Sequence, residues 1–159
     1  LREDAEGLPE LGIVGDRHTS QGIHGGPNKA LCLFSLEKLE ILRAEGHSVA
    51  PGSTGENVTI SELHWRHAVP GARIRLGQDV LIEVTDYADT CWKNAVWFKD
   101  GDFTHIDEGQ RPGFGRIYAK VLKTGMIRSG DSVEVLEDSA TERASRRQIP
   151  TMRWPTDFR

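Results

Sequence analysis

The sequence is divided by frequent glycine and proline into short runs of alternating polar and apolar residues, and this pattern most constrains the fold. The 159 residues include 17 Gly and 7 Pro. Segments of strand length lie between these breaks, at residues 30–34, 57–60, 73–76, 80–85, 116–122 and 132–136. Residues 77–79 have the composition of a hairpin turn, and residues 129–131 that of a turn entering the last strand. Many short strands with close turns predict a mainly β fold, an antiparallel β-barrel or barrel-like sheet.

Helical patterns are confined to two short segments. The first begins after Ser35, a good N-cap, ends at Gly46, and carries on one face Leu36, Leu39, Ile41 and Leu42. The second covers residues 91–99, with Asp89 or Thr90 as its candidate cap. Its apolar residues Trp92, Ala95 and Val96 have i, i+3, i+4 spacing, which predicts a face packed on the core. Trp97 and Phe98 are expected to pack there too.

Composition excludes several classes of protein. The net charge of −4 and the pI of about 5.9 argue against nucleic acid as the main ligand. No apolar run approaches the roughly 18 residues of a membrane span, and the acidic first residues contain no signal-peptide core. Two cysteines exclude a disulfide-rich scaffold. We expect a cytoplasmic protein with one domain over residues 1–138 and an extended tail over residues 139–159.

A glycine-rich polar segment near the start of the chain is the first candidate site. It contains Asp16-Arg17-His18, then Gly25-Gly26 and Lys29. The two glycines let backbone N–H groups approach an anion, and the cationic side chains of Arg17 and Lys29 can bind a phosphate. A surface loop whose glycines only make turns explains the same residues, and the two interpretations stay open.

A second polar group precedes the strand at residues 57–60. Glu56 and Asn57 could lie at a barrel rim, where a carboxylate or an amide hydrogen-bonds a heterocycle. A tight turn in which Asn57 simply starts the strand is equally consistent with the sequence.

Cys91 is the residue with the clearest chemical potential. It follows the strand at residues 80–85 and stands at the start of the second predicted helix, with Lys93 close by. The positive end of a helix and a neighbouring cation both favour the thiolate, which is the nucleophile and the metal ligand. Cys32 lies inside an apolar strand and is expected to be an inert core thiol.

The histidines offer a further alternative. His47, His64, His67 and His105 fall in polar turns, so we expect solvated surface imidazoles. A zinc or small-anion module built on Asp16, His18 and His24 is the third-ranked functional hypothesis, because their spacing matches no standard zinc pair.

Taken together, short motifs over residues 12–136 resemble the MOSC domain, named for the C-terminal domain of molybdenum cofactor sulfurase. In order they are Gly15-Asp16-Arg17-His18, Gly25-Gly26-Pro27-Asn28-Lys29-Ala30, Pro51-Gly52-x-x-Gly55-Glu56-Asn57, a single cysteine after a strand (Cys91), Arg111-Pro112-Gly113, Val121-Leu122-x-x-Gly125 and Arg128-x-Gly130-Asp131-x-Val133. The chain is most similar to the small stand-alone bacterial type that resembles the hydroxylaminopurine-detoxifying proteins.

The resemblance implies a β-barrel-like fold that binds a molybdenum–pterin cofactor through Cys91. It implies that Cys91 is both catalytic residue and metal ligand, with the cofactor bound by Asp16, Arg17, His18, Gly25, Gly26, Lys29, Glu56 and Asn57. The activity implied is reduction of N-hydroxylated compounds, with electrons from a partner protein. The alternative is a sulfur carrier that holds a persulfide on Cys91 and is loaded by a cysteine desulfurase. No pyridoxal phosphate, nucleic-acid partner or membrane is expected.

Three features depart from the family pattern. Thr90 replaces the usual proline before the cysteine, and Lys29 stands where arginine is common. Lysine keeps the charge but cannot bind a phosphate through two parallel hydrogen bonds. The family's first strand is expected to be short or absent before Leu1, which would leave one barrel edge open.

Overall fold

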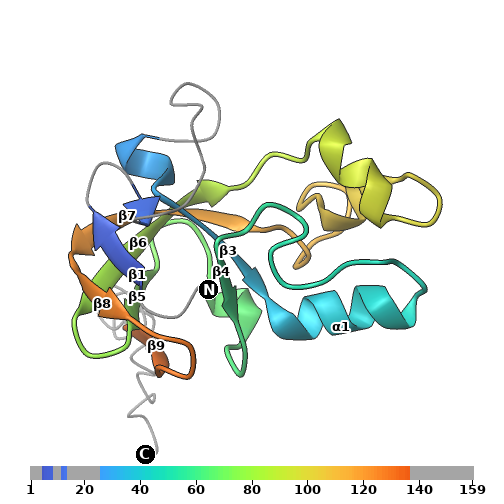
Figure 1. Cartoon of the computed structure of the whole chain (residues 1–159). Helices are drawn as coiled ribbons and strands as arrows, with labels where there is room; N and C mark the ends of the chain where they lie inside the picture. Colours follow the sequence, from blue (N-terminus) through green and yellow to red (C-terminus); the bar gives the residue numbers. More distant parts are fainter. Residues whose placement is uncertain (1–4, 9–11, 14–25, 137–159) are drawn as a thin grey trace, which may run out of the picture.

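The computed structural model describes residues 26–136 and, for the backbone alone, residues 5–8 and 12–13. A strongly curled sheet fills one side of the molecule, and a helix and several short helical turns lie on the other (Figure 1). In these ranges no helix is long and apolar enough to cross a bilayer.

The larger sheet has six strands in the order β4-β3-β7-β6-β5-β9. Its strands are β3 (Leu31–Ser35), β4 (Val58–Ile60), β5 (Arg73–Leu76), β6 (Val80–Tyr87), β7 (Ile117–Lys123) and β9 (Val133–Leu136). All neighbouring pairs are antiparallel except β3 and β4, which run parallel. The chain joins these two through the helix that follows β3, because parallel neighbours need a crossover connection.

A smaller sheet of three strands has the order β2-β1-β8. Its strands are β1 (Ala5–Leu8), β2 (Gly12–Ile13) and β8 (Gly125–Ile127). A single residue, Thr124, separates the end of β7 from the start of β8. The two sheets are therefore continuous along the chain, and together they curl into a half-barrel (Figure 1).

The mainly β, barrel-like prediction is confirmed, and each of the six predicted segments contains a strand. Two details were wrong. The β3–β4 pair is parallel where an antiparallel sheet was expected, and the short strands β1, β2 and β8 were not predicted. Strands of two to four residues containing glycine carry too little alternation to be recognised from sequence.

The first predicted helix is confirmed as α1 (Leu36–Ala44). Ser35 Oγ accepts the Lys38 N–H at 3.3 Å, so the serine caps the first turn as expected. Gly46 has a φ of 97°, a left-handed conformation that stops the helix. Leu39 and Leu42 are buried, but Ile41 is 42% exposed and does not belong to the core face.

The second predicted helix was wrong. Residues Trp92–Trp97 form η3, a 3₁₀ helix of six residues whose N-cap is Cys91, not Asp89 or Thr90. A 3₁₀ helix has three residues per turn, so residues four apart do not share a face. Trp92 is 73% exposed and Val96 is 74% exposed, whereas Phe98 is buried.

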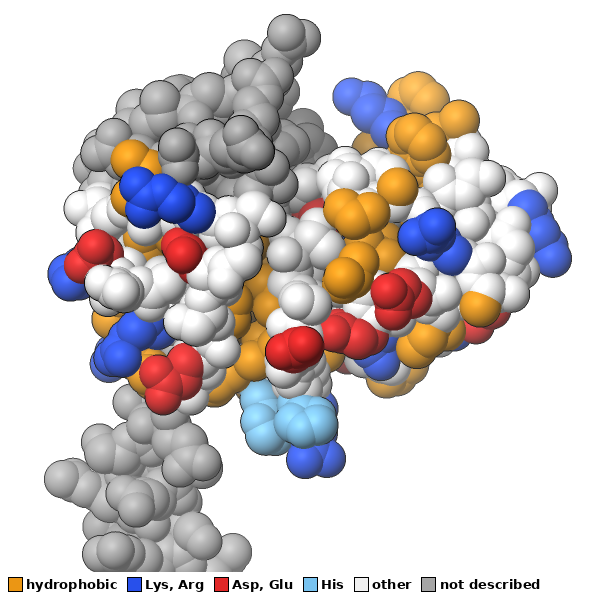
Figure 2. All heavy atoms as spheres, turned by 60° about the horizontal axis from the view of Figure 1, so that its bottom comes forward, with side chains coloured by type: hydrophobic (Ala, Val, Ile, Leu, Met, Phe, Trp, Pro, Cys, Tyr) orange, Lys and Arg blue, Asp and Glu red, His pale blue; other side chains and the backbone are white. Residues whose placement is uncertain are grey.

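Three more 3₁₀ turns connect the strands: η1 (Pro27–Lys29), η2 (Trp65–His67) and η4 (Phe103–Ile106). The main core lies between the curled sheet, α1, η2 and η4. Within it, Trp65 packs edge-on against Phe34 and donates its indole N–H to the Gly115 carbonyl at 3.0 Å. Acidic and basic side chains are interspersed on the face drawn in Figure 2, with hydrophobic side chains between them.

Candidate functional site

The two thiols lie in opposite environments. Cys91 is half-buried, has an extended backbone (φ −131°, ψ 140°), and its side chain makes no hydrogen bond that caps η3. Cys32 lies in β3 and is 6% exposed, and burial raises the pKa of its thiol to about 11. Of the two cysteines, Cys91 is therefore the one that a ligand can reach. The short η3 gives it much less helix dipole than the predicted helix would have given.

Arg116 connects the Cys91 segment to the loop at residues 51–57. It lies immediately before β7 and is 5% exposed. One of its guanidinium nitrogens donates to the Thr54 carbonyl, and the other donates to the Asp89 carbonyl at 2.7 Å. Its Nε is buried and has no hydrogen-bond partner among the described residues. A single buried cation thus fixes two loops that each carry a predicted site residue.

Lys29 joins the same group from η1. Its ammonium lies 3.7 Å from the Asp89 carboxylate, which is 80% exposed, and 4.7 Å from the centroid of the Tyr118 ring. Thr85 donates its hydroxyl to the Asn28 carbonyl at 2.5 Å, and this holds η1 against β6. Lys29 is consequently brought next to the segment that leads into Cys91.

Tyr118, in β7, packs against the Cys32 side chain. It packs with Cys32 and Ala88 in a small buried cluster separate from the main core. Burial raises the pKa of its phenol, and the nearby negative forms of Cys32, Asp89 and Cys91 raise it further, against a lowering effect of Arg116. The phenol therefore stays protonated at neutral pH.

Glu56 hydrogen-bonds within the loop at residues 51–57, and Asn57 hydrogen-bonds to the neighbouring strand β3. The Glu56 carboxylate is buried and accepts the Gly52 N–H and the Thr54 hydroxyl, both at 2.7 Å. The Asn57 side-chain oxygen accepts the Cys32 N–H at 2.8 Å, and the Asn57 N–H donates to the Cys32 carbonyl at 2.9 Å. Through Thr54, Glu56 sets the position of a carbonyl that Arg116 binds.

The remaining predicted site residues fall in two groups. Asp16, Arg17, His18 and Gly25 lie outside the described residues, as does His24 of the alternative zinc module. Gly26 is described and has a φ of 98°, which fits a glycine at the start of η1. The structure thus places Lys29 against Asp89, two residues before Cys91, and links Glu56 to the same segment through Thr54 and Arg116.

Sequence reasoning missed Arg116 and Tyr118. A usable signal existed, because residues two apart in a strand point to the same face. Arg116 and Tyr118 flank Ile117 at the start of a predicted strand, so one polar face there could have been inferred.

A second polar cluster lies where α1 ends. A cavity of about 390 Å³ is lined by Glu45, His47, Lys99, Asp100, His105 and Arg111. Here a prediction was wrong: His47, expected as a solvated imidazole, is 6% exposed. Its ring packs against Phe98 and His105, which lie far along the chain. His64 and His67 are exposed as predicted.

Sequence comparison places this chain beside known proteins. The model of the MOSC domain family matches residues 20–134. A protein named "Reductase" from Gibberella moniliformis is 32% identical over 130 residues, covering 79% of this chain and 23% of its own length. Protein YiiM of Escherichia coli is 31% identical over 134 residues, covering 81% of this chain and 58% of YiiM. This chain therefore spans well under two thirds of these curated relatives.

The crystal structure of YiiM from Escherichia coli has the same fold. It superposes with a TM-score of 0.64 at 24% sequence identity and covers 85% of this chain and 63% of that one.

Proposed function

The chain belongs to the MOSC domain family, and from that premise we propose that it binds a molybdenum–pterin cofactor through Cys91 and reduces N-hydroxylated compounds. The similarity to a protein named "Reductase" supports an oxidoreductase role. The half-buried Cys91 thiol, with Lys29, Arg116 and Tyr118 gathered around its segment, carries the proposal.

The donor set fits such a group. Molybdenum bound to a pterin dithiolene favours soft sulfur ligands, and Cys91 is the thiol that is reachable from solvent. Arg116 retains a buried Nε–H without a hydrogen-bond partner among the described residues, so the site offers a donor that an anionic group could engage. A hard-cation site would instead need several carboxylate or carbonyl oxygens directed at one point.

The cofactor's phosphate would lie against the cationic side of the site. Lys29 provides an ammonium there, and Gly26 at the start of η1 leaves room for the backbone to approach an anion. We include Asp16, Arg17, His18 and Gly25 in this cradle on the basis of the family motif. Glu56 acts indirectly, because it accepts the hydroxyl of Thr54, whose carbonyl binds Arg116. Asn57 also acts indirectly, through its hydrogen bond with Cys32 in β3.

Reduction of an N-hydroxyl group consumes two electrons and two protons and releases an amine and water. The bound cofactor would supply the two-electron chemistry, and a separate redox protein would supply the electrons. The two protons come from solvent. The raised pKa of the Tyr118 phenol keeps it a hydrogen-bond donor and not a proton source, and the Lys29 ammonium lies against the Tyr118 ring.

Metal and pterin analysis tests the proposal. The wild-type chain and Cys91→Ser are purified from cells with an intact cofactor pathway, with Cys32→Ala as the matched control. We expect molybdenum and pterin in the wild type and the control, and a folded Cys91→Ser protein with neither. Stoichiometric molybdenum in Cys91→Ser would refute cysteine ligation.

The same preparations test the sulfur-carrier alternative. Incubation with a cysteine desulfurase and cysteine, followed by mass spectrometry, would show one added sulfur on Cys91 if the chain carries a persulfide. A stable adduct in a protein that never binds molybdenum would favour the carrier over the reductase.

A further inference from the structure

We propose that Glu45, His47 and His105 form a separate site for a divalent transition-metal ion of the zinc class. This site lies at the cavity beside the end of α1 and uses none of the residues assigned to the molybdenum cofactor. The zinc-class site is therefore independent of the proposed molybdenum-cofactor function.

The three side chains converge from different parts of the chain. Glu45 is the C-cap of α1, His47 follows two residues later, and His105 comes from η4. One ligand atom from each lies within 4.8 Å of the others. Metal–ligand bonds of about 2.0–2.2 Å place tetrahedral ligand atoms about 3.3–3.6 Å apart, so each pair of ligand atoms must approach by at most about 1.5 Å.

His47 is the fixed member of the set. Its side chain is 3% exposed and is packed between Phe98 and His105, with ring centroids at 5.0 and 4.5 Å. The packing leaves the ring little freedom to turn, so the position of its nitrogens is set by the fold. Its Nε2 lies 4.0 Å from a Glu45 oxygen, which is too long for a hydrogen bond.

The other ring nitrogen of His47 accepts the Lys99 N–H at 3.4 Å. This contact keeps the proton of the neutral ring on Nε2. Binding of a metal at Nε2 moves that proton to Nδ1 and breaks one long hydrogen bond. The ion must therefore compensate for this loss.

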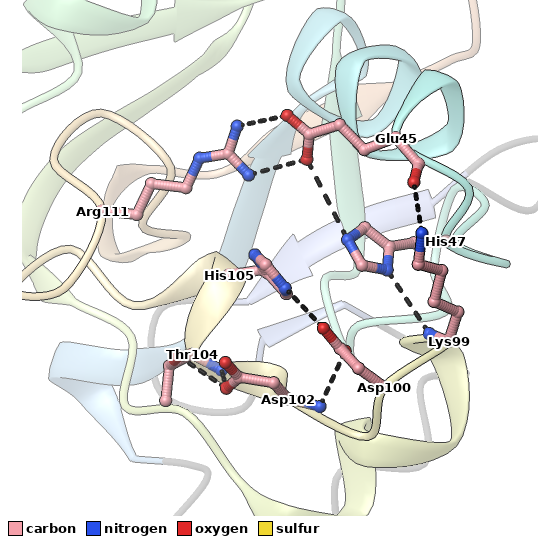
Figure 3. Close-up of polar contacts among 8 residues, drawn as sticks. All are labelled: Glu45, His47, Lys99, Asp100, Asp102, Thr104, His105 and Arg111. Carbon is pink, nitrogen blue, oxygen red and sulfur yellow. Dashed lines mark hydrogen bonds and ion pairs between the residues drawn. The ribbon is translucent and has the colours of Figure 1, made fainter.

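His105 is already oriented in the way that metal-binding histidines are. Its Nε2 lies 3.3 Å from an Asp100 oxygen, and such carboxylate–histidine pairs fix the ring of a ligand. Figure 3 shows the other ring nitrogen of His105 turned to the side of Glu45 and Arg111. Asp102 also lies close, since ligand atoms of Asp100, Asp102 and His105 fall within 4.8 Å of one another. The neighbouring acids add negative charge that attracts a dication.

Arg111 is the competitor for the third ligand. Its guanidinium binds both oxygens of Glu45, at 2.7 and 2.9 Å (Figure 3). Its Cζ also lies 3.6 Å from the centroid of the Phe114 ring. A metal ion at Glu45 replaces this guanidinium at the carboxylate. Because the ion must displace a bidentate ion pair, we expect a Kd on the order of micromolar. Removing Arg111 should tighten binding.

The test uses chelator-treated protein titrated with Zn²⁺ against a chromophoric chelator, and with Co²⁺ as a spectroscopic probe of geometry. We expect one ion per chain and the visible absorption of tetrahedral Co²⁺. His105→Gln and Glu45→Gln should each weaken binding by about tenfold or more, and Arg111→Gln should strengthen it. These residues are partly exposed, so the variants are expected to fold, and His47→Gln is a supporting variant only.

Three controls separate this site from others. The exposed pair His64 and His67, replaced together by alanine, should leave binding unchanged, as should Cys91→Ser and the double variant His18→Ala, His24→Ala. The proposal is overturned if wild type binds no ion, if His105→Gln and Glu45→Gln bind as wild type does, or if a control abolishes binding. Loss of molybdenum chemistry in Cys91→Ser with zinc binding intact would keep the two sites distinct.

Discussion

Replacing Arg116 tests whether one buried cation holds the candidate site together. Its guanidinium donates to the carbonyls of Thr54 and Asp89, which belong to different loops. Hydrogen bonds from a charged donor contribute about 1.5–3 kcal/mol each, and the two carbonyls would lose their partner together. Removal of the unpartnered Nε–H returns part of this free energy. We therefore expect Arg116→Ala to lower the free energy of unfolding by about 3–5 kcal/mol.

Urea unfolding followed by circular dichroism measures this loss. Arg116→Lys retains a charge that reaches only one carbonyl, so a loss of about 2 kcal/mol is expected. The matched control is Arg73→Ala, because Arg73 forms an ion pair with Glu83 at 3.3 Å and its side chain is 46% exposed. Such surface pairs contribute about 0–1 kcal/mol. If Arg116→Ala were as stable as Arg73→Ala, the bridging role of Arg116 would be wrong.

Three further predictions follow from the described residues. The pKa of His47 is lowered in the folded state, so the unfolded chain binds the proton first when the pH drops below the ordinary value of 6.5. The free energy of unfolding should therefore fall in that range. Urea titrations at several pH values should show a smaller loss in His47→Phe. Gly77→Ala should lower the thermal unfolding temperature more than Gly71→Ala. Both glycines have positive φ, but only at Gly77 would an added Cβ meet a side-chain oxygen, that of Asp131 at 2.9 Å. An aromatic disulfide reagent should modify Cys91 in the folded protein and Cys32 only after unfolding, and rapid modification of both would contradict the assigned burial.

The strands were predictable because their alternation is a local property. Residues 73–76 and 80–85 alternate on either side of a short turn, and the structure pairs them from Arg73–Glu83 to Leu76–Val80. The parallel β3–β4 pair was not predictable in the same way. Its register depends on the crossover through α1 and on Asn57, which binds both backbone groups of Cys32.

Errors arose where distant segments decide the outcome. The polar neighbours of His47 suggested a surface turn, but Phe98 and His105 cover its ring from more than fifty residues away. Trp92 and Val96 have helical spacing, yet the segment forms a 3₁₀ helix and exposes both. The bridging role of Arg116 was missed because its partners are backbone carbonyls of two distant loops, and its spacing from Tyr118 indicates only a shared face.

X-ray absorption at the molybdenum edge gives the most direct test of the central claim that Cys91 is a metal ligand. The measurement compares the sulfur neighbours of molybdenum in the wild-type protein and in Cys32→Ala with those in the free cofactor. We predict one additional sulfur neighbour in both proteins, supplied by Cys91. A sulfur shell identical to that of the free cofactor would contradict the account.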